Sequence, residues 1–204
     1  MKFRSPKKLI SKATGTHAGR LTLAAVPVGV VAALLVGGVA QGQVPVSFAV
    51  SGSQFQISAS LLEGTGFSQY AGVAEDTEGG EHTVAIANIK SATLSDLCQS
   101  VVSETPLGKV GVLIKAGGDS PASASDLQIG MTGLKGDASF GKIRIGVDAS
   151  TVSTSAKGSA GDFAQDADTV TIKNLQQTAW STQASVFTLT GMTLELTDGS
   201  KGCF

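Results

Sequence analysis

The segment LQIGMTGLKGDASFGKIRIGV, residues 127–147, carries the pattern that decides the fold. Its two ends, 127–131 and 143–147, share the order apolar, polar, Ile, Gly, apolar, so apolar side chains occupy every second residue. A period of two is typical of a β-strand with one buried face. The middle part, GLKGDAS at 133–139, has the glycine and aspartate content of a turn. The segment therefore predicts two strands joined by a turn.

The same alternation recurs along the chain. The alternating sets that begin at Val110, Leu127 and Ile143 are 17 and 16 residues apart. The sets that begin at Val170 and Phe187 are again 17 residues apart. Further alternating sets begin at Val46, Phe55, Val84 and Met192. This pattern predicts an all-β fold, either an elongated antiparallel sheet or a sandwich. The regular spacing keeps a short β-solenoid as the alternative.

Polar segments separate the alternating sets. Exposed loops are expected at 74–82, 117–125, 155–161 and 158–168, which are rich in Gly, Ser, Ala and Asp. One helical interruption is expected in SATLSDLCQSVV, residues 91–102. There Ser95 is expected to cap a short helix that contains Leu94, Leu97 and Val101 at helical spacing.

The N-terminal part of the chain has a different composition. Residues 1–20 contain six basic residues and no acid, and Leu21–Val39 is a run of nineteen residues without a charge. A helix of that length rises about 28 Å, close to the hydrocarbon thickness of a bilayer. The run is either a retained membrane anchor or a secretory signal cleaved near Ala40. The chain then divides into a basic cytoplasmic leader (1–20), a transmembrane or signal segment (21–40) and an exported β-domain (41–204).

The charge of the exported part limits its partners. It carries nine basic residues against all sixteen acidic ones, a formal charge of −7. Nucleic-acid binding depends on neutralising phosphates with Lys and Arg, so this balance argues against a nucleic-acid partner. The basic leader places the N-terminus in the cytoplasm and the C-terminal domain outside.

Both cysteines of the chain, Cys98 and Cys203, fall in the exported part. An even number of cysteines in an oxidising compartment predicts a disulfide. This bond would connect the end of the chain to its middle.

Serine hydrolysis finds weak support in the motifs. No serine has glycine at both the −2 and +2 positions, as a nucleophile elbow requires. The nearest approach is Ser120 in Gly118-Asp119-Ser120, and the only histidine of the exported part is His82. A Ser120–His82 pair is therefore the one candidate for a catalytic site.

Two acidic groups are candidate cation sites. Asp162, Asp166 and Asp168 form a weak candidate for a calcium loop. A second group lies around His82 and consists of Glu75, Asp76, Glu78 and Glu81. Neither group has the spacing of a known calcium loop, and zinc lacks a Cys/His set. We expect no cofactor.

Trp180 is the sole tryptophan. An indole ring at a sheet edge usually packs against neighbouring side chains, and the alternative is contact with a lipid headgroup or a protein partner. Trp180 is therefore the one aromatic candidate for a ligand contact.

Several short motifs resemble one family of exported proteins. They are the basic leader with its apolar run, Phe48-Ala49-Val50-Ser51-Gly52, Leu97-Cys98-Gln99-Ser100, Leu134-x-Gly136-Asp137-Ala138-x-Phe140 with Ile143-x-Ile145-Gly146, Gln165-x-Ala167-Asp168, Ala179-Trp180 and Cys203. The resemblance is to an uncharacterised exported or membrane-anchored family of streptomycetes and related actinobacteria, whose members often carry the label cholesterol esterase. It implies no particular catalytic residue.

Two functions follow as expectations. The first is a non-enzymatic cell-envelope protein, anchored by residues 21–39 or secreted, whose β-domain binds an apolar ligand such as a lipid, binds an envelope protein, or is structural. The second is a hydrolase of lipid or steryl esters, a carboxylic ester hydrolase that uses His82.

Overall fold

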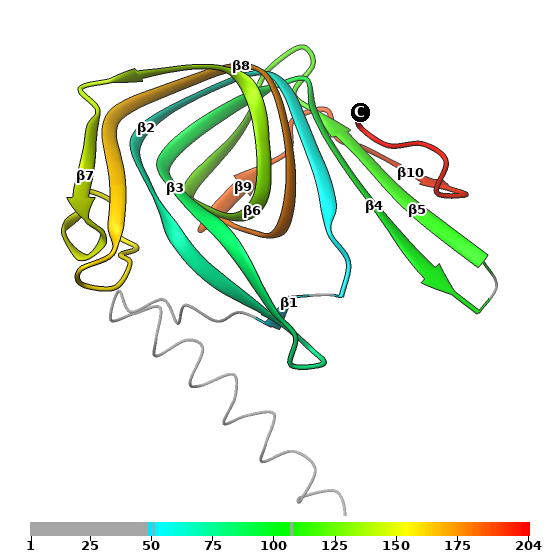
Figure 1. Ribbon diagram of the computed structural model, residues 1–204. Helices are drawn as coiled ribbons and strands as arrows, with labels where there is room; N and C mark the ends of the chain where they lie inside the picture. The colour runs from blue at the N-terminus through cyan, green and yellow to red at the C-terminus, as the bar shows by residue number, and fades with distance from the viewer. Residues whose placement is uncertain (1–48, 51, 107) are drawn as a thin grey trace, which may run out of the picture. The chain divides into compact units, whose positions relative to one another are not determined.

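The computed structural model describes residues 49–50, 52–106 and 108–204 (Figure 1). The leader, the apolar segment 21–39 and the cleavage position near Ala40 lie outside these residues. Within them, no helix is long and apolar enough to cross a membrane. One 3₁₀ turn, Ala149–Thr151, accompanies the strands. The strands are β1 (Ala49–Val50), β2 (Phe55–Asp76), β3 (Glu81–Ser95), β4 (Leu97–Thr105), β5 (Gly108–Ala116), β6 (Ala122–Gly141), β7 (Arg144–Asp148), β8 (Phe163–Gln183), β9 (Val186–Thr188) and β10 (Thr193–Thr197).

All ten strands belong to one sheet, in the order β10-β5-β4-β2-β3-β6-β8-β7, with β1 on β2 and β9 on β6. Every pairing among the described strands is antiparallel except β1 with β2. The first residues of β2 also pair with β8, so β2, β3, β6 and β8 form a closed ring of pairings. The predicted all-β, antiparallel fold is confirmed.

The long strands bend rather than end at their glycines. Gly136 has a φ of 152°, and the β6–β8 register shifts between Lys135 and Asp137. Such a bulge lets a strand change direction without breaking the ladder. The predicted turn at 133–139 is therefore wrong, because these residues continue β6. Except for Leu134 they are polar or small, which suits an exposed part of β6 as well as it suits a turn.

The predicted helix in 91–102 is also wrong. β3 ends at Ser95 and β4 begins at Leu97. Between them Asp96 adopts a φ of 51° and accepts a hydrogen bond of 2.6 Å from the Ser60 hydroxyl. Since aspartate tolerates the left-handed region, this one residue makes the corner that the helix was expected to make.

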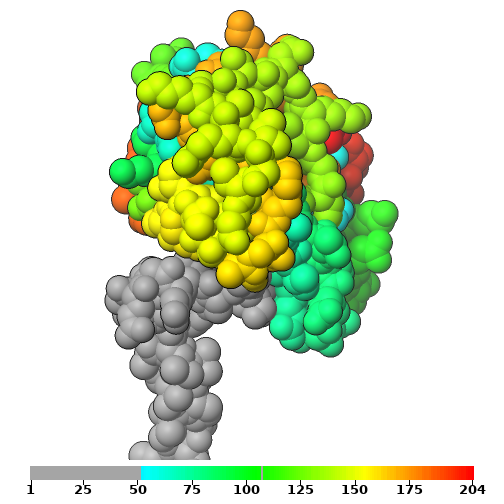
Figure 2. Space-filling model, turned by 60° about the vertical axis from the view of Figure 1, so that its left-hand side comes forward, coloured from blue at the N-terminus to red at the C-terminus, as the bar shows by residue number. Residues whose placement is uncertain are grey.

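The predicted loops are shorter in the structure than in the sequence pattern. The turn of 74–82 contains only residues 77–80, the loop of 117–125 ends before Ala122, and β8 begins at Phe163 within 158–168. Residues 155–161 do form a loop. It belongs to the segment that follows β7, yellow in Figure 2, which covers this face of the molecule beside the β2–β3 hairpin.

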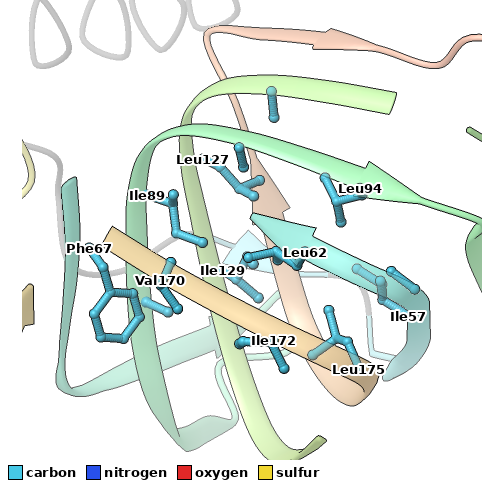
Figure 3. Packing of buried hydrophobic residues seen from close by; sticks show 14 of the residues in the cluster. Ile57, Leu62, Phe67, Ile89, Leu94, Leu127, Ile129, Val170, Ile172 and Leu175 are labelled. Carbon is cyan, nitrogen blue, oxygen red and sulfur yellow. The ribbon is translucent and has the colours of Figure 1, made fainter. Parts of the chain in front are cut away.

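The main core lies inside the ring. Side chains from all four ring strands point toward one another there (Figure 3). The most deeply buried members include Leu62, Leu127, Val170 and Leu175, each no more than 2% exposed. Every residue of this core, and both cysteines, lie between residues 55 and 203. Residues Gly42–Phe204 form one compact unit, which is of a size that can bury a core of its own.

A smaller core lies beneath the segment after β7. It contains Tyr70, Val84, Ile86, Ala149, Val152 and Ala164, with Trp180 packed at its border. A buried chain of hydrogen bonds runs along it from Gln128 through Asn88 to Ser68 and Thr154. These bonds connect β6, β3 and β2 to the covering segment, so the segment is held by polar contacts as well as by packing.

The tight approach of this segment gives a first prediction. A Cβ atom at Gly158 would lie 2.6 Å from the Ala149 Cβ and 2.9 Å from the Tyr70 ring. We expect Gly158→Ala to lower the free energy of unfolding by about 1–3 kcal/mol, the usual cost of overpacking. Gly118→Ala is the control, because a Cβ there meets no atom within 4 Å. Urea denaturation of both variants makes the comparison; equal stabilities would contradict the close packing.

Candidate interaction surface

Three strands project from the ring at one side of the molecule. We call β4, β5 and β10 the ledge (Figure 1). β4 is attached to β2 through residues 98–101, β5 pairs with β4, and β10 pairs with β5. The two faces of the ledge have opposite character.

The C-terminal tail covers the polar face of the ledge. Cys203 forms a disulfide with Cys98 on β4, with 5.7 Å between the Cα atoms. The Cys203 N–H donates to Gln56 Oε1 at 3.2 Å and to Ser100 Oγ at 3.1 Å. Lys201 forms an ion pair of 2.7 Å with Glu195 on β10. The predicted disulfide is therefore present, and it fastens the tail across this face.

The opposite face of the ledge is largely apolar: Val110, Met192, Leu194 and Leu196 are exposed, and Val101, Val112 and Ile114 are half-buried. The register places Leu194 beside Ile114, and Leu196 beside Val112. Val112 in turn lies beside Val101 of β4. The exposed fractions are 52% for Met192, 56% for Leu194, 68% for Leu196 and 38% for Val110. We call this the apolar face, and it consists of Val101, Val110, Val112, Ile114, Met192, Leu194 and Leu196.

The size of the apolar face limits what it can bind. Three strands spaced about 4.8 Å apart, each contributing five residues of about 3.3 Å, give a flat area on the order of 250 Å². A stable protein–protein interface buries about 800 Å² on each partner. The apolar face alone is therefore too small for a stable protein complex, but it is large enough for lipid acyl chains.

The structure brings His82 and Trp180 together. Their rings are stacked with centroids 3.8 Å apart, and His82 Nε2 lies 2.9 Å from Asp76 Oδ2. Asp76 also accepts the backbone N–H groups of Glu78 and Gly80 and so closes the β2–β3 turn. The N–H of Gly80, followed by His82 and the N–H of Glu78, lowers the pKa of Asp76. Asp76 and Trp180 thus hold His82 in place beside the turn of this hairpin.

Ser120 lies at the other end of β3 from His82. It is exposed in the β5–β6 loop, two residues before Ala122, which pairs with Leu94 near the end of β3. His82 is the second residue of β3. The twelve residues from His82 to Leu94 correspond to about 40 Å of strand path. The structure does not bring the two candidate catalytic residues together.

The three aspartates of the weak calcium candidate have separate roles. Asp166 is fully buried and binds Arg144 through both carboxylate oxygens, with Arg144 Nε 2.8 Å from Oδ1. Asp168 forms an exposed ion pair of 3.1 Å with Lys142. Asp162 is exposed, and its backbone carbonyl accepts the Ala149 N–H. Within the described part of the chain, no group of three acidic, His or Cys residues is arranged to hold a metal ion, the acids around His82 included.

Asp166 is a residue whose importance the sequence did not reveal. Burial raises its pKa, but the hydrogen bonds from Arg144 and from the Ser153 N–H outweigh burial, so the net pKa is lowered. The bond from Ser153 is 3.0 Å long and ties the segment after β7 to β8. Arg144 and Asp166 face each other in the β7–β8 register, a pairing that no local pattern indicates.

The fold is thus an all-β domain with a closed ring, an attached ledge and one disulfide. The chain belongs to a family described as family of unknown function (DUF6230), whose model matches residues 51–204. The match covers both the ring and the ledge. No curated protein and no solved structure matches the chain.

Proposed function

We propose that this is a non-enzymatic cell-envelope protein whose exported β-domain contacts the lipid surface through the apolar face of the ledge. The observation that carries the proposal is the set of large apolar side chains left exposed on β10, of which Leu196 is 68% exposed. Soluble domains keep such side chains scattered, and a contiguous set marks a binding surface. Here the set continues from β10 onto β5 and ends on β4 at Val101, which lies between the polar Gln99 and Ser103 on the same face.

The length of the chain before the domain favours a lipid surface as the partner. Nine residues, 40–48, separate the apolar segment from Ala49 of β1. Nine extended residues reach at most about 32 Å. If residues 21–39 are a retained anchor, the domain is confined to a shallow layer above the bilayer. In Figure 1, β1, the first described strand, and the tip of the β4–β5 hairpin lie at the same end of the domain.

The charges of the ledge are compatible with a bilayer surface. The exposed ends carry Lys109 with Glu104 and Lys201 with Glu195 as ion pairs. The acidic domain as a whole is repelled by an anionic headgroup layer. The ledge is not, because its positive and negative charges balance locally. Burial of an apolar side chain of this size contributes about 1.5–3 kcal/mol when complete.

A vesicle assay with residues 41–204 tests the proposal. We expect the domain to co-sediment with vesicles of zwitterionic lipid, and Leu194→Glu with Leu196→Glu to lower the partition coefficient at least about tenfold. The matched control is Ile145→Glu, which changes a side chain that is 66% exposed on β7, outside the ledge. Equal binding by both variants would overturn the proposal. Retention only on anionic vesicles, lost in high salt, would replace it with an electrostatic contact.

A further inference from the structure

The outer edge of β10 is a second feature of the ledge, distinct from its apolar face. β10 is the last strand of the sheet, and among the described residues its one strand neighbour is β5. An edge strand presents a row of backbone N–H and C=O groups that can pair with another strand. Proteins usually block such edges with lysine, proline or a bulge. β10 contains none of these, and its single charge, Glu195, is paired with Lys201.

The sequence at this edge is nearly symmetric about Leu194. Residues 192–196, which are Met192 just before β10 and the first four residues of the strand, read Met-Thr-Leu-Glu-Leu, with apolar and polar side chains alternating equally in both directions. Two antiparallel copies related by a two-fold axis perpendicular to the sheet place opposite residues on the same face. Centred on Leu194, this register puts Met192 opposite Leu196 of the second copy. It also puts Thr193 opposite Glu195 of the second copy.

The charges select this register over the next one. Centring the pair on Glu195 would place two carboxylates directly opposite each other, and like charges in that position are destabilising. Centring on Leu194 places each Glu195 opposite a threonine, while its own Lys201 stays at 2.7 Å. The apolar row then contains three side chains of each copy without a polar interruption.

We propose that a second copy of this chain pairs with β10, edge to edge and centred on Leu194, to form a six-stranded sheet from two ledges. This inference goes beyond the proposed function and rests on the edge rather than on the face. The perpendicular two-fold axis leaves both apolar faces on the same side, so both copies can address one surface. Five residues bury far less than the 800 Å² per partner of a stable dimer, so the pair forms at high local concentration.

Disulfide trapping tests the register. Residues that face themselves across an antiparallel pair have Cα atoms about 4.5–5.5 Å apart, within the range of a disulfide. We expect Leu194→Cys in concentrated residues 41–204 to give a covalent dimer under mild oxidation. Glu195→Cys is the matched control, because its two copies would lie about 8 Å apart in this register, too far for a disulfide.

Three outcomes are distinguishable. A Leu194→Cys dimer that forms at least about tenfold faster than dimers of Glu195→Cys and of Ile145→Cys, an exposed position on β7, supports the pairing. Faster trapping through Glu195→Cys overturns the register, and equal rates at all three positions overturn the pairing altogether. Peptide mapping confirms in each case that Cys98 remains bonded to Cys203. Because the test uses no vesicles, its failure is separate from a failure of lipid binding.

Discussion

Replacing both cysteines, Cys98→Ala with Cys203→Ala, is expected to lower the free energy of unfolding of residues 41–204 by about 4–5 kcal/mol. The bond joins positions 105 residues apart, so it removes a large part of the conformational freedom of the unfolded chain. A domain of this size loses about 2–4 °C in Tm for each kcal/mol, so the expected shift is about 8–20 °C. Urea denaturation followed by the fluorescence of Trp180 measures the loss.

Part of the loss of stability is local to the C-terminal tail. Without the bond, the tail keeps the Lys201–Glu195 pair, whose side chains are 60% and 55% exposed, and the two hydrogen bonds from the backbone N–H of residue 203 to Gln56 and Ser100. Exposed pairs contribute about 0–1 kcal/mol, which is too little to hold the tail on the ledge. We therefore expect amide exchange to accelerate in residues 198–204 of the variant before it does so in the ring. Reduced wild-type protein is the control and should match the double variant. A change in stability below about 1 kcal/mol would show that the tail is held by other contacts.

The strands and the disulfide were predictable because both depend on local or countable features. Alternation at Leu127–Met131 reports one buried face, and this face is indeed inside the ring. The cysteine count predicted the bond between Cys98 and Cys203. The turn expected at 133–139 failed because a bulged, exposed strand has the same composition as a turn.

The candidate surfaces could not be predicted from the same patterns. Alternation at Val110–Ile114 and Met192–Leu196 correctly gives one apolar side for each strand. Whether that side is buried depends on what lies over it, and here the tail covers the polar side instead. The stacking of His82 on Trp180 likewise depends on how β3 and β8 approach each other in the closed sheet. These are consequences of tertiary arrangement, which no single segment encodes.

The substitution Arg144→Ala is expected to lower the free energy of unfolding by about 2–3 kcal/mol at neutral pH, less than a fully buried pair would lose, because the Arg144 side chain is 60% exposed. Asp166 has a side chain that is 1% exposed, and Arg144 is its only ionic partner in the β7–β8 pair. Removing the guanidinium leaves a buried carboxylate with one remaining strong donor, the Ser153 N–H. The matched control is Lys142→Ala, which breaks the neighbouring pair with Asp168, whose carboxylate is 63% exposed. That control should cost about 0–1 kcal/mol.

The pH dependence of the loss identifies its cause. In the wild type the lowered pKa of Asp166 contributes stability that is complete above its unfolded value of about 3.9. This stability is lost as the pH falls through the lower, folded pKa. In Arg144→Ala, Asp166 loses the largest of the effects that lower its pKa, while the Ser153 N–H remains, so the folded pKa of Asp166 rises. The ionised carboxylate then contributes less stability at neutral pH, and the difference from the wild type shrinks as the pH falls and the carboxylate is protonated in both proteins.

A second substitution separates the charge from the packing. Asp166→Asn keeps the shape of the side chain and its capacity to accept the Ser153 N–H but carries no charge to bury. Combined with Arg144→Ala, it should recover part of the stability lost by Arg144→Ala alone, and it should remove the pH dependence of the difference. Urea denaturation at about pH 7 and about pH 4 makes both comparisons. If Arg144→Ala were no more destabilising than Lys142→Ala at neutral pH, the pair would be merely a surface contact. The segment after β7 would then owe its position to the Asn88–Ser68–Thr154 hydrogen bonds and to its apolar packing.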